Sequence, residues 1–360
     1  STRSSVSPLP DFAQERLPRF FVESWALKMW MRNRFKAWKR LSFPLYTKQK
    51  QYKELALMEK IKKIPFAFSG VMLGMAALGN LLQSNGEGIR LVFGCIAFVI
   101  LILLLLKLVL FPNAVKEELS TPIGAGVFAT FPMALMLFSV YVKPFIPGIS
   151  FPIWVFANAI HIVLILYFTK TYILRFDEKN VHTVWYIVYV GIVVASLTTP
   201  AYKTFAYGQA AFYFGFVALL ILLCVVTKRY VKLPVPDPAK PLMMIYAAPM
   251  ALCTAGYIQA FPEKNKSFVL FLLVATSVIY LFALFKSVQF LRFPFYPSYA
   301  AFTFPFVISA IATKQCFAVL TKMGMNVALL QPVVLVETII AAVFTIYACL
   351  RYFQFILAKK

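Results

Sequence analysis

Long apolar runs alternate with short polar connections through most of this chain. A helix needs about 20 mostly apolar residues to cross the hydrocarbon core of a bilayer, and ten stretches reach that length. They cover residues 64–82, 89–110, 123–142, 151–170, 183–199, 205–227, 242–261, 267–290, 299–320 and 332–355. The connections between them are short and rich in turn-forming residues, as in QSNGEG and PVPDPAKP. The pattern predicts an all-α integral membrane protein with ten transmembrane helices.

The spacing of these segments is regular. The odd-numbered segments begin near residues 64, 123, 183, 242 and 299, which gives steps of 59, 60, 59 and 57 residues. A fixed period indicates tandem copies of one supersecondary unit, and here each step spans one helical hairpin. Five similar hairpins inserted in the same direction close most simply around an axis. We therefore expect five tandem helical hairpins in a pseudo-five-fold ring around a central pore.

The odd-numbered segments also carry helix-breaking residues near their middles. Pro132, Pro249 and Pro305 lie in the third, seventh and ninth segments, and Gly70 and Gly191 lie at the matching depth of the first and fifth. A mid-helix Pro removes a hydrogen bond and kinks the helix, and the freed backbone group is tolerated in a membrane only against protein or a water-filled cavity. These five residues are predicted kinks of pore-facing helices. The alternative is a solid bundle kinked for packing alone.

The predicted pathway offers weak ligands rather than fixed charges. Its expected lining residues are Phe68, Ser69, Phe131, Thr254 and Thr303. Hydroxyls and kink-exposed amides can coordinate an anion weakly enough to release it, as conduction requires.

Lysines are expected to form a basic outer mouth to this pathway. They are Lys143, Lys203, Lys264, Lys314 and Lys322. Basic charge at a mouth raises the local concentration of anions. Scattered, solvated lysines are the alternative interpretation.

Ionisable groups inside the spans are rare. Glu337, in the tenth segment, is the one clear intramembrane acid and a candidate coupling acid for a proton-linked carrier. The five Cys residues stand apart, and the sequence has no Cys/His cluster, so we expect no metal site and no cofactor. No nucleophile with an adjacent base and no paired carboxylates occur within the spans, so an enzyme is not expected.

The charged residues are mostly basic, with 36 Lys and Arg against 13 Asp and Glu. The tail before the first segment holds 15 Lys and Arg, the other loops and ends on that side hold 14, and the opposite side holds seven. The positive-inside rule then places both termini in the cytoplasm of a plasma (inner) membrane. Because the basic residues flank apolar runs, they indicate contact with anionic lipids and not with nucleic acid.

Residues 1–57 are expected to be a basic amphipathic tail, cytoplasmic or interfacial, ahead of a pore domain at 58–360. In the tail, SWALKMWMRNRFKAWKRL alternates aromatic and basic residues, which is typical of a helix lying in the headgroup region. Met58 would also serve as a native start, so the interpretation that part of the tail is foreign to the protein stays open.

Three phrases carry a family resemblance: IPFAFSGVMLGMAALGN, FATFPMAL and YAAFTFPFVISAIA. The chain resembles the tellurite-resistance/dicarboxylate transporter family over roughly residues 64–360. That family includes the bacterial tellurite-resistance protein and the slow anion channels of plant guard cells. The resemblance implies five hairpins around a pore in each subunit of a homotrimer, with a Phe of the ninth helix plugging the pore. The matching residue here is Phe304.

Two functions follow as hypotheses. The first is a gated channel for small anions such as chloride or nitrate, with Phe304 as its gate. The second is a secondary carrier or exporter of C4-dicarboxylates or of oxyanions such as tellurite, which would need a titratable site such as Glu337.

Overall fold

A computed structural model describes residues 48–358, and every regular element in that range is a helix. The chain divides into two units, Ser1–Met58 and Glu59–Lys360. Helix α2, Lys48–Lys63, runs across this division. The expected interfacial helix lies outside the described residues, and the division of the chain at residue 57 stays a prediction.

The second unit contains two sets of long helical segments. The odd-numbered segments, called the inner helices below, are α3 (Phe68–Leu82), α6 with α7 (Pro122–Phe128, Thr130–Val142), α9 with η4 and α10 (Val184–Val190, Gly191–Val193, Val194–Tyr202), η5 with α12 (Asp237–Tyr246, Ala247–Ala260) and η6 with α14 (Pro297–Phe302, Phe304–Lys322). The even-numbered segments, called the outer helices, are α4 (Glu87–Leu110), α8 (Pro147–Phe168), α11 (Phe205–Lys232), α13 (Lys266–Phe290) and α15 (Leu330–Leu357). Short elements lie between them: η1 (Gln83–Asn85), α5 (Pro112–Leu119), the π-helical turn η2 (Thr169–Ile173) and η3 (Glu178–Asn180).

Nine helices of the described range are long and apolar enough to cross a membrane. The tenth candidate is Phe68–Asn85, which qualifies together with the preceding Leu57–Lys63, from which it is bent by 82°. The prediction of an all-α, multi-pass membrane protein is confirmed. Two helix ends were placed too early, because α10 continues through Pro200 to Tyr202 and α11 continues to Lys232.

Burial separates the two sets as the sequence predicted. In the most apolar stretch of each outer helix only 28–33% of residues are buried, whereas the four inner spans from Pro122 onward have 67–94% buried. In α3, thirteen of the fifteen residues are buried. An exposed apolar surface on this scale marks contact with a membrane or with other protein subunits, so the outer helices form the exposed apolar layer.

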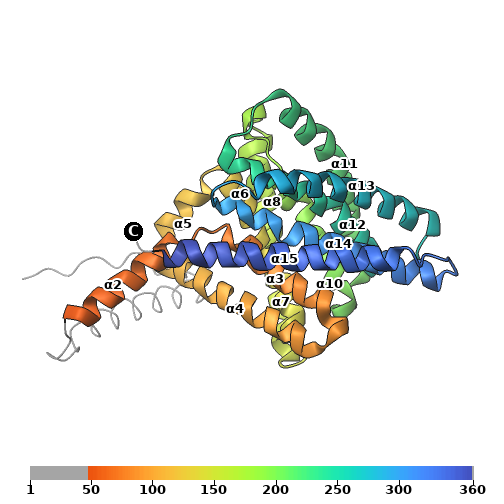
Figure 1. Cartoon of the computed structure of the whole chain (residues 1–360), viewed down its shortest axis with the longest axis horizontal. Coiled ribbons are helices and arrows are strands. Elements are labelled where there is room, and N and C mark those ends of the chain that lie inside the picture. The colour runs from red at the N-terminus through yellow and green to blue at the C-terminus, as the bar shows by residue number, and fades with distance from the viewer. Residues whose placement is uncertain (1–47, 359–360) are drawn as a thin grey trace, which may run out of the picture. The chain divides into compact units, whose positions relative to one another are not determined.

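The inner helices form a closed ring of contacts. Helix α3 contacts α7, α7 contacts α10, α10 contacts α12, α12 contacts α14, and α14 returns to α3. The outer helices pack on the outside of this ring, and Figure 1 shows α3 between α4 and α15, both of which it contacts. This arrangement agrees with five hairpins placed around one axis.

Each inner segment is interrupted along its length. The interruptions lie at Ala129, at Gly191–Val193, at the junction of Tyr246 with Ala247, and at Thr303. Three of them come two to three residues before Pro132, Pro249 and Pro305, because the ring of a Pro clashes with the turn that precedes it. The four residues before α3 are also not helical.

Small residues let the inner helices approach closely. A Cβ placed on Gly74 of α3 would lie 2.4 Å from Thr303 Cβ, and one on Gly256 of α12 would lie 2.5 Å from Val193 Cγ1. Carbon atoms that are not covalently bonded to each other do not approach this closely in proteins. Glycine is therefore required at both positions, where neighbouring members of the ring touch backbone to side chain.

Candidate functional site

Two cavities lie at opposite ends of the ring. The larger, called the apolar cavity, has a volume of about 600 Å³ and is lined by the first halves of the inner segments and the loops before them. Its walls include Leu73, Met133, Val190, Ile245 and Ala301, one from each of the five inner segments. The side chains facing it are mostly aliphatic, so water and ions bind weakly to its surface.

The smaller cavity, called the polar cavity, has a volume of about 460 Å³ and is lined mostly by the second halves of the inner segments, with Arg90 of α4 and the first turns of α14. Its polar side chains are Asn80, Gln83, Arg90, Lys143, Thr198, Gln259 and Gln315. Amide, guanidinium and ammonium groups are hydrogen-bond donors. The polar cavity therefore has the chemistry to hold an anion.

Phe304 lines both cavities. It is the first residue of α14, it follows the non-helical Thr303, and its side chain is 6% exposed. The Phe304 side chain therefore lies where the apolar cavity and the polar cavity meet.

The break before Phe304 is fixed by hydrogen bonds to a neighbouring helix. The Thr303 hydroxyl lies 2.9 Å from the carbonyl oxygen of Gly70 and 2.7 Å from that of Ala300, and it can donate to either. Gly74 packs against the same threonine. Helix α3 thus positions the first turn of α14, and with it the ring of Phe304.

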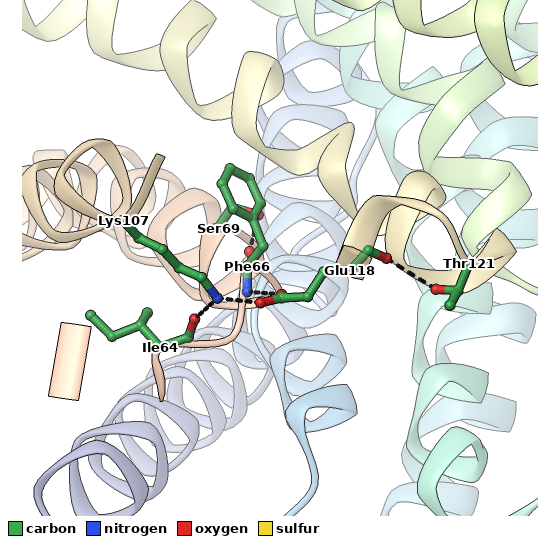
Figure 2. A network of polar contacts seen from close by, with 6 residues as sticks. All are labelled: Ile64, Phe66, Ser69, Lys107, Glu118 and Thr121. Carbon is green, nitrogen blue, oxygen red and sulfur yellow. Dashed lines mark hydrogen bonds and ion pairs between the residues drawn. The ribbon is translucent and has the colours of Figure 1, made fainter. Parts of the chain in front are cut away.

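The break before α3 is held by side chains from outside that helix (Figure 2). Lys107, at the end of α4, donates to the carbonyl oxygen of Ile64 and forms an ion pair with Glu118 of α5. The other carboxylate oxygen of Glu118 accepts the backbone N–H of Phe66 at 2.7 Å. Backbone groups released by a break must find partners at membrane depth, and these two side chains supply them.

Four of the predicted kink residues lie at or next to a break, and Gly70 does not. Gly70 lies inside α3, and the chain breaks before it, at residues 64–67, which include Pro65. The prediction of a kink at Gly70 was wrong. The small residue is needed for packing, because a Cβ there would lie 3.1 Å from Ala300 Cβ.

The five predicted lining residues are buried, and none of them lines either cavity. Phe68 stacks on Tyr352 of α15 with ring centroids 4.8 Å apart, and Phe131 packs against Phe66. Phe68 therefore faces an outer helix, and Phe131 faces the non-helical residues before α3.

The three hydroxyl residues in that set are engaged in hydrogen bonds. The hydroxyls of Ser69 and Thr130 lie 2.6 Å apart, and those of Thr254 and Thr276 lie 2.9 Å apart. Thr303 bonds to α3 as described above. The assignment of these residues to the cavity walls was wrong, and the hydroxyls join neighbouring helices instead.

The residues that do face the cavities follow helical periodicity. In α3 they are Gly70, Leu73, Ala77 and Asn80, and in α14 they are Phe304 with Pro305, Ile308, Ile311 and Gln315. Residues three and four apart share a helix face, whereas Phe68 and Ser69 lie roughly 100–200° away from Gly70 around the helix. The positions of the kinks gave no information on the rotation of each helix about its own axis.

The predicted basic mouth divides into separate environments. Lys143 lines the polar cavity and donates to the carbonyl oxygen of Ala201, whereas Lys203, Lys264, Lys314 and Lys322 line neither cavity. Lys314 ties α14 to the end of α3 through Leu81 O at 2.9 Å and Ser84 Oγ at 2.7 Å. Only Lys143 of this set is in direct contact with a cavity.

Arg90 is a charged residue of the polar cavity that the sequence did not single out. It is 5% exposed, its Nε lies 2.9 Å from Asn80 Oδ1, it forms an ion pair with Glu87, and it lies over the ring of Tyr141. Its position three residues after Glu87, at the start of an outer helix, was the available signal. A charge at the first turn of a span is easily taken for a solvated residue.

Glu337 lies on α15, is 4% exposed and lines neither cavity. Its Oε2 has no hydrogen-bond partner among the described residues. Thr313 of α14 and Tyr280 of α13 are its polar neighbours. The carboxylate is thus behind the ring of inner helices. No group of three or more His, Cys, Asp or Glu residues in the described part of the chain could hold a metal ion.

Comparison with known proteins agrees with this architecture. No individual curated protein matches the chain. A family model described as voltage-dependent anion channel, the SLAC1 family, matches residues 63–353, which is most of the chain and all ten predicted spans apart from a few end residues. The resemblance inferred from the sequence phrases is therefore confirmed, and the chain belongs to the SLAC1 family of anion channels and transporters.

Proposed function

We propose that this protein is a gated channel for small inorganic anions such as chloride or nitrate. The ion passes from the polar cavity, past Phe304, into the apolar cavity. One observation carries the proposal: two cavities at opposite ends of a closed ring of helices have Phe304 as a shared wall residue. An aromatic ring between two cavities can close a path sterically or by dewetting.

The polar cavity is the proposed resting place of the anion. Arg90 and Lys143 contribute positive charge, and Gln259 and Gln315 contribute amide donors. Both cations already have protein partners, so a passing ion shares its donors instead of capturing them. Binding is then weak enough for release, which a channel requires.

The proposed setting is a plasma (inner) membrane with both termini in the cytoplasm, on the side where the inner segments begin. This places the polar cavity on the outer side. By analogy with the family, we propose a homotrimer with one pathway in each subunit.

A carrier of C4-dicarboxylates or oxyanions is the second candidate, and Glu337 favours it. A buried carboxylate with an unpartnered oxygen is a common element of proton-linked transport. Its location behind the ring, out of both cavities, makes direct contact with substrate impossible without rearrangement.

Flux through reconstituted protein separates the two. Purified full-length chain in liposomes should conduct chloride or nitrate passively when valinomycin sets a potassium potential. Uptake of malate or succinate that follows a pH gradient, with no passive chloride flux, would instead establish the carrier. Empty liposomes and liposomes with heat-denatured protein are the controls.

A further inference from the structure

One acidic side chain faces the proposed anion pathway. Glu118 is the only charged residue among those lining the apolar cavity, within the described part of the chain, and the lining contains no Lys, Arg or His. Its side chain is about one-third exposed, at 34%. An anion in the apolar cavity therefore meets a carboxylate and no wall cation, which is the wrong sign for anion selectivity.

The carboxylate is compensated from behind. One oxygen is paired with Lys107 Nζ and the other accepts the Phe66 N–H at 2.7 Å. Lys107 itself is 1% exposed and does not line the cavity. Figure 2 shows its ammonium between the carboxylate and the Ile64 carbonyl oxygen, so the positive charge is in contact with Glu118 from a residue that is not part of the cavity lining.

Lys107 neutralises the charge that Glu118 presents to the cavity, and dissolved salt screens this ion pair only weakly. The ion pair has no net charge, and the Phe66 N–H adds a positive partial charge at the second oxygen. Because Lys107 is buried, salt does not screen its contact with Glu118 as it would screen a solvated lysine. Loss of Lys107 would expose the full charge of the carboxylate to the pathway.

We propose that Lys107 is a specificity-determining residue of the pathway: by neutralising Glu118 from behind the cavity wall, it keeps the apolar cavity permeable to anions. The inference rests on the proposed channel function and goes beyond it, because it assigns selectivity to a residue that the ion does not touch. The Lys107–Glu118 pair also ties α5 to the break before α3. Its effect on the charge of the cavity must therefore be tested separately from its effect on the packing of these elements.

Three variants separate these roles: Lys107→Met, Glu118→Gln, and the two combined. The readout is the chloride-to-potassium permeability ratio, taken from the reversal potential under a salt gradient in planar bilayers. A single uncompensated charge roughly 10 Å from an ion, at an effective dielectric constant of about 20, changes its occupancy roughly tenfold. We expect Lys107→Met to lower the ratio by at least about tenfold, because the uncompensated carboxylate disfavours chloride and favours potassium. Glu118→Gln should keep or raise the ratio, and the double variant should return it to within about twofold of wild type.

The controls keep the result independent of folding yield. A permeability ratio does not depend on how many channels are active, and Lys107→Arg should preserve it. Lys116→Met removes the same formal charge from an exposed position on α5 and should leave the ratio unchanged, because a solvated charge is screened.

Two outcomes would overturn the inference. One is an unchanged ratio in Lys107→Met while anion current persists. The other is a double variant as poorly selective as Lys107→Met, which would mean that the pair acts only through structure. Absence of anion current from wild type and from Phe304→Ala alike would instead refute the proposed function.

Discussion

Replacing Phe304 by Ala should convert a mostly closed pathway into a conducting one. The side chain is 6% exposed and lies where the two cavities meet. In the proposed channel the aromatic ring leaves this position before an ion passes. In the variant nothing larger than a methyl group remains, so the cavities join into one space.

The expected change in chloride flux follows from the burial of the Phe304 side chain. Burying a Phe side chain stabilises the buried position by about 1.5–3 kcal/mol. If opening removes that contact, the closed state outweighs the open one by roughly 10- to 150-fold at 25 °C. Phe304→Ala removes this preference, so the passive chloride flux per protein should rise by a factor within that range.

The assay is chloride efflux from liposomes containing equal amounts of folded protein, checked by gel filtration in detergent. Phe306→Ala is the matched control, because Phe306 lies two residues further along α14 and is fully buried. It packs against Tyr280 and Phe344 and lines neither cavity. This control should lose about 3–5 kcal/mol of stability without a gain in flux. Equal flux from wild type and Phe304→Ala, or an equal rise in both variants, would refute the gate.

Three further perturbations test other parts of the structure. Gly74→Ala places a Cβ 2.4 Å from Thr303 Cβ, and such overpacking should cost about 1–3 kcal/mol and alter basal chloride flux by displacing the turn that carries Phe304; a variant with wild-type melting temperature and flux would contradict the close contact. Glu337→Gln should leave chloride flux within about twofold of wild type, since the residue lines neither cavity; loss of pH-coupled solute uptake in liposomes would favour the carrier instead. Burial and the nearby Arg229 charge lower the pKa of His182, in the loop before α9, from 6.5 to about 4, so the folded state keeps this His neutral. Its contribution to stability is therefore complete above pH 6.5 and is lost as the pH falls towards 4, and the melting temperature should decline less over that interval in His182→Gln than in wild type.

The sequence predicted the architecture of this protein well because the relevant physics is local and repetitive. Apolar length gives the spans, the steps of 57 to 60 residues give the hairpins, and Pro132, Pro249 and Pro305 each lie two to three residues after a break. The division into exposed and buried helices followed from the cost of unpaired backbone groups in hydrocarbon.

The identity of the cavity walls was predicted poorly because it depends on helix rotation. Phe68 and Ser69 lie next to Gly70 in the chain, yet only Gly70 faces the apolar cavity. Testing whole helical faces instead of kink neighbours would have selected Gly70, Leu73, Ala77 and Asn80 together. The ion pair between Lys107 and Glu118 could not be predicted from the sequence. It joins the end of α4 to the short helix α5, and both side chains also bind backbone groups of the break before α3.

The tight glycine contacts at Gly74 and Gly256 constrain how fast and by what motion this pathway can open. The inner helices cannot all tilt away from the central axis without losing these contacts between neighbouring helices. Rotation of one aromatic side chain needs no such cooperative rearrangement, so opening events should be brief and only weakly dependent on temperature. Residues of graded size at position 304, such as Leu and Val, should then give a graded series of conductances.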